Sequence, residues 1–160
     1  MNKKLMVLSV ACFTFIVIIA SLTLFLNKSK KNDGCSTTII IYQDNSRFNL
    51  NLNFMYSLST MTGVVAISGI YLENDTVKGK IRRDVIYNIN ENKDTYRFHS
   101  VKIQKFDNIT PEPVTDAKLA SALPDFYVYP DKDISYTITN QGEDGFMFVI
   151  GKRPLFFCSR

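Results

Sequence analysis

The sequence predicts a mainly β (α+β) domain that follows an N-terminal transmembrane helix. Three observations lead to this prediction: an uncharged apolar segment from Leu5 to Leu26, alternation of apolar and polar residues from Arg47 to Leu58, and four-residue turns between strand patterns. Consecutive strands joined by short turns are typical of an antiparallel meander. We therefore expect one meander sheet or small barrel with one short helix, and the sequence does not distinguish a closed barrel from an open sheet.

The apolar segment Leu5–Leu26 contains 22 residues and no charge. As a helix with a rise of about 1.5 Å per residue, it would span roughly 33 Å, enough to cross a hydrocarbon core of roughly 30 Å. Its length and its large apolar C-terminal residues fit an uncleaved signal anchor better than a cleaved signal peptide, which is the weaker alternative. We expect residues 1–4 to form a tail, 5–26 the anchor, 27–36 a linker and 37–160 the β-rich domain.

Two cysteines lie at the ends of the expected β-rich domain. Cys35 follows the apolar segment and Cys158 is third from the C-terminus, whereas Cys12 lies inside the segment. In an oxidising compartment, a Cys35–Cys158 disulfide would close a loop of more than about 100 residues and contribute about 4–5 kcal/mol by the chain-entropy estimate. The alternative is two free, partly buried thiols in a cytoplasmic domain. We favour the disulfide.

The cysteines also decide the expected orientation in the membrane. Lysines flank the apolar segment on both sides, so the positive-inside rule gives nearly a tie. A disulfide requires an oxidising compartment. We therefore expect a short cytoplasmic N-terminus, one span, and the β-rich domain outside the cytoplasm.

The β-rich domain is expected to contain seven strands and one short helix. The helix would run through the sequence DAKLASAL, with Thr115 or Asp116 as its N-cap and Pro124 ending it. Gly69 is the expected site of a bulge or bend. The expected strands are 37–43, 47–58, 63–72, 77–90, 95–106, 134–139 and 146–150.

No motif in the sequence indicates catalysis. His99 is the single histidine, which excludes a His-based metal cluster, and no nucleophile elbow, phosphate-binding glycine loop or zinc-protease motif occurs. The acidic residues Asp131, Asp133, Glu143 and Asp144 do not have EF-hand spacing and are interpreted as solvated turn charges. The net charge of +4 is not gathered on one face. We expect no enzyme activity, no cofactor or metal, and no direct nucleic-acid binding.

Two sets of residues are candidates for a function that needs no catalysis. His99 is a candidate pH sensor, because imidazole is the side chain that titrates in mild acid; an exposed or satisfied strand histidine is the alternative. Aromatic residues near the C-terminus are candidate contacts for a partner, with core packing as the alternative. These candidate contact residues are Phe126, Tyr127, Tyr129 and Phe156.

Several of these features resemble the FidL-like enterobacterial membrane proteins. The shared features are a short N-terminal anchor, a cysteine soon after it, Leu123-Pro124-Asp125-Phe126 with Tyr129-Pro130, and the terminal run from Arg153 to Cys158. The overall size and the anchor are also similar to those of PsaF and MyfF, small membrane regulators of fibrillar adhesin expression.

This resemblance implies a companion role. Members of the group are similar in arrangement to ToxS, an inner-membrane protein with a periplasmic domain that is paired with a ToxR-like activator. The chain is then expected in a bacterial inner membrane, with its C-terminal domain in the periplasm. It would stabilise or modulate a ToxR-like winged-helix activator of fimbrial or fibrillar adhesin genes, in response to acidity or temperature. An anchored assembly or chaperone module for a surface fibre is the alternative.

Overall fold

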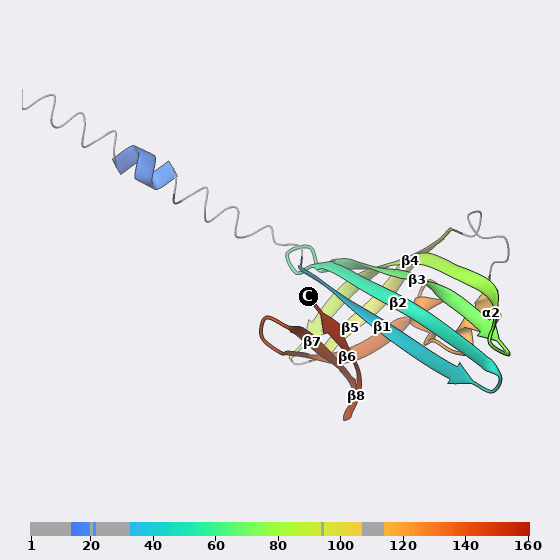
Figure 1. Cartoon of the computed structure of the whole chain (residues 1–160). Coiled ribbons are helices and arrows are strands. Elements are labelled where there is room, and N and C mark those ends of the chain that lie inside the picture. The colour runs from blue at the N-terminus through green and yellow to red at the C-terminus, as the bar shows by residue number, and fades with distance from the viewer. Residues whose placement is uncertain (1–13, 20, 22–32, 94, 107–113) are drawn as a thin grey trace, which may run out of the picture. The chain divides into compact units, whose positions relative to one another are not determined.

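Eight antiparallel strands form a closed barrel, and each strand pairs with its neighbours in the sequence (Figure 1). The computed structural model describes residues 14–19, 21, 33–93, 95–106 and 114–160. The predicted mainly β class is confirmed. The sequence left a closed barrel and an open sheet as alternatives, and the structure is a closed barrel. The strands are β1 Asp33–Gln43, β2 Ser46–Ser57, β3 Thr62–Glu73, β4 Thr76–Asn92, β5 Thr95–Lys105, β6 Asp133–Asn140, β7 Gly145–Ile150 and β8 Arg153–Ser159.

The period-two pattern of β2 places its apolar side chains inside the barrel. Phe48, Leu50, Leu52 and Phe54 are at most 1% exposed, whereas the asparagines between Leu50 and Phe54 are exposed. Successive side chains of a strand point to opposite faces, so one row fills the barrel and the other meets water. The predicted dry and wet faces are confirmed along β2, but Leu58, the last residue of the expected strand, lies in the turn after β2 and is 52% exposed.

Short turns between the long strands use residues that tolerate a left-handed backbone. Asn74 and Asp75, which join β3 to β4, have φ values of 48° and 60°. Positive φ at both central residues of a two-residue loop matches the right-handed twist of a hairpin, and Asn and Asp accept it more readily than most residues. These residues therefore set the meander by local geometry.

Two strand details differ from the sequence expectation. The register of β3 against β4 shifts between Tyr71 and Leu72, not at Gly69. A Cβ at Gly69 would lie 2.1 Å from the backbone oxygen of Asn49, so this glycine permits close approach of β2 rather than a bulge. β1 begins at Asp33, so the end of the expected linker belongs to the barrel.

The last strand, β8, was not expected from the sequence. It pairs antiparallel with β7, and the register between these strands shifts between Phe148 and Val149, near Pro154. Proline lacks a backbone donor and occurs in sheets at edges or irregularities, which is why this segment carries a weak strand signal.

The helical segment that follows β5 is shorter than expected. α2 spans Asp116–Ala120, and the Thr115 hydroxyl caps it by accepting a hydrogen bond from the backbone nitrogen of Lys118 at 3.3 Å. Beyond Ala120 regular α-helical pairing ends, and the carbonyl of Leu119 accepts from both Ala122 and Leu123, at 3.0 and 2.9 Å. A 3₁₀ helix, η2, then covers Asp125–Tyr127 directly after Pro124. The expected continuation of the helix to Pro124 is therefore wrong.

The described part of the N-terminal segment is short. Residues 14–19 and 21 are helical, and their side chains include the exposed Phe15 and Ile16. Within the residues that the structure describes, no helix combines the length and apolar character needed to cross a membrane. Most of the expected anchor 5–26, the tail 1–4 and residues 27–32 of the expected linker lie outside the described residues.

Candidate functional site

A disulfide joins the first and last strands of the barrel. Cys35 of β1 and Cys158 of β8 are bonded, with their Cα atoms 5.3 Å apart, and both are buried. Backbone pairing between these strands consists of one register pair, Ser36 with Ser159, where the Ser159 hydroxyl also donates to the Ser36 carbonyl at 3.2 Å. The predicted disulfide is confirmed, and it lies where strand pairing contributes least to closure.

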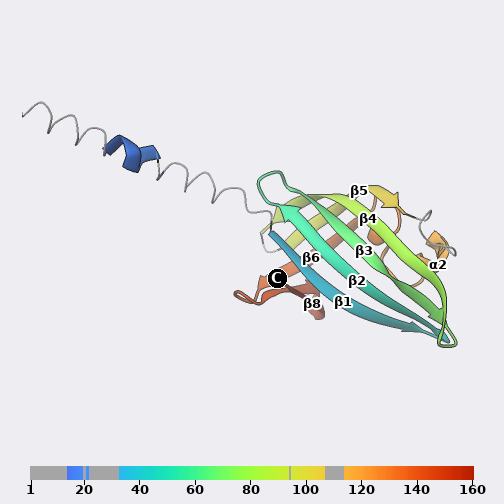
Figure 2. The same ribbon diagram turned by 45° about the horizontal axis from the view of Figure 1, so that its top comes forward.

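The rest of β1 has a free edge. β1 pairs with β2 along its whole length, but its residues 37–43 have no second strand partner among the described residues. Figures 1 and 2 show β1 extending past β8 toward the end of the barrel where α2 lies. Ile40 and Tyr42 of this stretch are 55% and 71% exposed on the outer face. A strand edge with unpaired N–H and C=O groups is a template for another strand.

One end of the barrel, which we name the closed end, is filled by the segment that contains α2 and η2. Leu119, Leu123, Phe126 and Val128 of this segment are between 0% and 5% exposed and belong to the hydrophobic core. Each apolar side chain fully buried in this way contributes about 1.5–3 kcal/mol. The segment therefore acts as an internal plug.

A buried arginine anchors the plug. Arg83 lies on the inward face of β4 and is 2% exposed, and its Nη1 is 3.2 Å from Oδ1 of Asp116. Lys105 of β5 pairs with the other carboxylate oxygen of Asp116. Burial alone would raise the pKa of Asp116, but hydrogen bonds and charge from Lys105 and Arg83 outweigh it and hold the pKa below its usual value.

Sequence reasoning missed Arg83, although a signal was present. Arg83 has the same parity in β4 as the inward-facing Ile81 and Val85, which places it inside the barrel. A cation at an inward position requires a buried partner. The partner, Asp116, comes from a segment 33 residues later, a distance that strand periodicity does not address.

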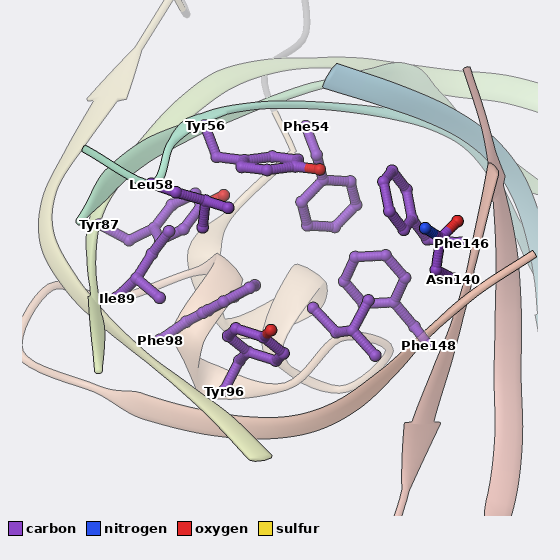
Figure 3. Close-up of a pocket in the computed structure, with 11 residues that line it drawn as sticks. Phe54, Tyr56, Leu58, Tyr87, Ile89, Tyr96, Phe98, Asn140, Phe146 and Phe148 are labelled. Atoms are coloured by element: carbon purple, nitrogen blue, oxygen red, sulfur yellow. The ribbon is translucent and has the colours of Figure 1, made fainter. Parts of the chain in front are cut away.

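The opposite end of the barrel, which we name the open end, contains an aromatic pocket of about 210 Å³. Seven of its eleven lining side chains are aromatic, and Figure 3 shows them pointing toward a shared space. The eleven lining side chains come from β2, β4, β5, β6 and β7, together with the turn after β2. The aromatic pocket is lined by Phe54, Tyr56, Leu58, Tyr87, Ile89, Tyr96, Phe98, Ile138, Asn140, Phe146 and Phe148.

The Tyr87 hydroxyl in this lining has no hydrogen-bond partner among the described residues, although Tyr87 is only 1% exposed. Its ring lies over Gly63 on the paired strand, where a Cβ would come within 2.4 Å of the hydroxyl oxygen. Burial is the main reason why the pKa of Tyr87 lies well above its usual value. The charges of the neighbouring Tyr56 and Tyr136 raise it further. The group is therefore a neutral hydroxyl without a partner in an apolar wall.

His99 lies between two carboxylates on the outside of the barrel. Its Nδ1 is 3.0 Å from Oδ1 of Asp133, its Nε2 is 3.5 Å from Oδ1 of Asp131, and its side chain is 42% exposed. Arg97 also pairs with Asp133 at 2.6 Å. The pKa of Asp133 is lowered most by the hydrogen bond from Arg97, and the hydrogen bond with His99 is the second largest cause. The candidate sensor thus belongs to a surface cluster of charges on β5 and at the start of β6.

The four aromatic candidates for partner contact do not form one surface. Phe126 and Tyr127 are buried at 0% and 2% exposure, and the Tyr127 hydroxyl bonds to that of Tyr136 at 2.6 Å inside the core. Tyr129 and Phe156 are half-buried, and Phe156 stacks on Phe148 at 4.8 Å. For Phe126 and Tyr127 the core-packing alternative is therefore correct, because they belong to the plug.

The described residues contain no group of three or more His, Cys, Asp or Glu side chains placed to hold a metal ion. The described residues do present a free β1 edge, a charge cluster around His99 and an aromatic pocket.

Comparison with known proteins identifies relatives for the barrel. Residues 32–158 match the family model described as the YqeJ C-terminal domain. The chain is also 39% identical over 129 residues to a protein of Escherichia coli (strain K12) named Uncharacterized protein YqeJ, an alignment that covers 81% of this chain and 79% of that protein. No solved structure matches the chain.

Proposed function

The chain belongs to the YqeJ C-terminal domain family, and we propose that it is a membrane-anchored periplasmic companion of a ToxR-like transcription activator. In this role the barrel stabilises or modulates the periplasmic part of the activator, which controls fimbrial or fibrillar adhesin genes. The companion itself binds no nucleic acid, needs no cofactor and catalyses no reaction.

The observation that carries this proposal is the free edge of β1. Residues 37–43 are paired on one side only, and the exposed Ile40 and Tyr42 lie beside that edge. Addition of a partner strand to such an edge supplies main-chain hydrogen bonds for affinity and side-chain contacts for specificity. A companion that binds one state of the activator shifts the population of that state by its differential affinity, without chemistry.

The disulfide and the apolar N-terminal segment support the proposed location. A buried Cys35–Cys158 bridge fits an oxidising compartment such as the periplasm. The uncharged run Leu5–Leu26 would hold the barrel at the inner membrane. Two domains tethered in one bilayer meet at high effective concentration, so a weak contact along one strand edge is sufficient.

The charge cluster around His99 is the proposed element for an acid response. Asp131 and Asp133 face its two ring nitrogens, and Arg97 competes for Asp133. An imidazolium at His99 would donate to both carboxylates at once and hold the start of β6 against β5. Replacing His99 with Gln keeps a polar side chain but removes the imidazole. The acid response of adhesin transcription is then expected to disappear; an unchanged response rules out His99.

The companion role is tested by deleting the gene and measuring activator abundance and adhesin transcription under inducing conditions. We expect both to fall. Normal levels of both would contradict the proposal. A defect confined to fibre assembly, with normal transcription, would instead favour the anchored assembly or chaperone module, which could use the same β1 edge for a fibre subunit.

Edge variants locate the contact. The double substitution Ile40→Lys and Tyr42→Lys adds two charges beside the free edge, a device that natural sheets use to block strand addition. The matched control is Val77→Lys, since Val77 is 50% exposed on β4. We expect co-purification of the activator to be lost with the double variant and kept with the control. Equal behaviour of the two variants would exclude the β1 edge as the contact.

A further inference from the structure

The barrel's own side chains do not fill its open end. The aromatic pocket has a volume of about 210 Å³ and lies among side chains that converge from five strands (Figure 3). An apolar protein cavity of about 150 Å³ is large enough to hold benzene. A space of this size therefore encloses one aromatic ring with a small substituent, and a slightly larger molecule would extend into the mouth beside Leu58, whereas a sterol or a long acyl chain does not fit.

The lining selects the chemical class of the occupant. It presents mostly aromatic rings, several of which already pack against one another, such as Tyr87 on Phe98 with ring centres 4.7 Å apart. An inserted ring could continue these stacked and edge-to-face contacts. The lining residues include no charged side chain. A charged ligand would lose its hydration without gaining an ion pair, so the occupant is uncharged.

One polar group of the wall makes no contact with the occupant. The Tyr87 hydroxyl is closed off from water-sized groups and has no hydrogen-bond partner among the described residues. It lies against Gly63, where any Cβ would collide with it. The ring of Tyr87, and not its hydroxyl, therefore lines the pocket.

We propose that the open end of the barrel is a binding site for an uncharged, mainly aromatic small molecule. The inference stands on the pocket and is independent of the companion role. A barrel that binds no activator can still bind the ligand, and the reverse also holds.

Benzophenone and 1,1-diphenylethylene form a matched pair of probes. They have nearly the same shape and size, but only benzophenone carries a carbonyl oxygen. We would titrate each into the full chain in lipid nanodiscs and follow the methyl signals of Leu58, Ile89 and Ile138 by NMR. We expect saturable shifts confined to the pocket methyls, with a Kd of about 10–200 μM for benzophenone.

A substitution at the rim tests the site. Leu58 and Leu155 are both half-exposed leucines, at 52% and 51%, but only Leu58 lines the pocket. We expect Leu58→Trp to fill the mouth and weaken benzophenone binding by about tenfold or more, and Leu155→Trp to leave it unchanged.

Three results would overturn the proposal. The first is the absence of saturable shifts at the pocket methyls with either probe. The second is equal weakening by Leu58→Trp and Leu155→Trp, which would place binding elsewhere. The third is tighter binding of palmitate than of benzophenone at the same methyls, which would refute the assigned size and charge.

Discussion

The two ends of the barrel are built from the same strands, yet one is packed and the other is not. At the closed end, the α2–η2 segment inserts Leu119 and Phe126 among the inward-facing side chains. At the open end, the inward-facing rings of the aromatic pocket surround about 210 Å³ of space. Strand alternation determines which side chains point inward, but a separate segment decides whether the space between them is filled.

The two ends are also held together in different ways. The closed end combines apolar packing with the buried Arg83–Asp116 pair. The Cys35–Cys158 bridge lies nearer the open end, since Cys35 pairs in register with Phe54 of the pocket lining. Packing therefore stabilises the closed end, and a covalent bond stabilises the seam near the open end.

Removal of the disulfide should have the largest effect. The bridge spans a sequence separation of 123, so replacing Cys35 and Cys158 with Ser should lower the free energy of unfolding by about 4–5 kcal/mol in urea titrations. Hydrogen exchange should accelerate first at the Ser36–Ser159 seam and only later in α2. Cys12→Ser is the control for loss of a thiol. Equal acceleration in α2 and at the seam would show that the two ends are one cooperative unit.

Replacing one leucine with alanine at each end should show which end is tightly packed, through the loss of unfolding free energy. Leu119→Ala creates a cavity in the plug and should cost about 3 kcal/mol of unfolding free energy, because Leu119 is fully buried. Leu58→Ala at the half-exposed pocket rim should cost less than about 0.5 kcal/mol. Thermal and urea unfolding measure both values. Similar costs would mean that the open end is packed in solution.

The buried ion pair should contribute an intermediate amount. Asp116→Asn leaves Arg83 without its carboxylate partner, and should cost about 1–3 kcal/mol of unfolding free energy. Lys105→Gln is the control, because Lys105 is 38% exposed and pairs with the same carboxylate, so we expect a smaller loss. A larger loss of unfolding free energy for Lys105→Gln than for Asp116→Asn would show that the exposed Lys105, and not the buried Arg83, holds the plug through Asp116.

Acid should weaken the barrel by protonating the carboxylates that form its ion pairs. The pKa values of Asp116 and Asp133 are lowered in the folded state, so the unfolded state binds more protons as the pH falls. Their stabilisation is complete above the unfolded value of about 3.9 and is lost as the pH falls through the lower folded values. Urea midpoints between pH 6 and pH 2 should fall less steeply in Asp116→Asn. An unchanged pH profile would contradict this assignment.

Much of the barrel could be predicted from local pattern, and the exceptions have physical reasons. The faces of β2 follow from strict alternation, and the turn at Asn74–Asp75 follows from residues that accept positive φ. β8 was missed because Pro154 and a register shift interrupt the strand signal. Closure of the sheet could not be predicted, since it depends on β1 meeting β8 at a sequence separation of more than about 100 residues.

The candidate sites were less predictable than the fold. The cysteine pair could be predicted from its position at the ends of the domain, and the structure confirms it. Phe126 and Tyr127 carry the same aromatic signal whether they are buried or exposed, and only the plug decides that they are buried. The aromatic pocket has no sequence motif, because its lining comes from single inward positions on five strands.

The Cys35–Cys158 bond turns the chain between these residues into a covalent ring. The free β1 edge, the aromatic pocket and the plug all lie within that ring. A protease that cuts once in any loop of the barrel therefore releases no fragment, and both pieces stay joined to the N-terminal segment. Two cuts, or one cut followed by reduction, are needed to shed any part of the domain. After a single nick, the β1 edge, the pocket and the plug thus remain in one covalently linked molecule.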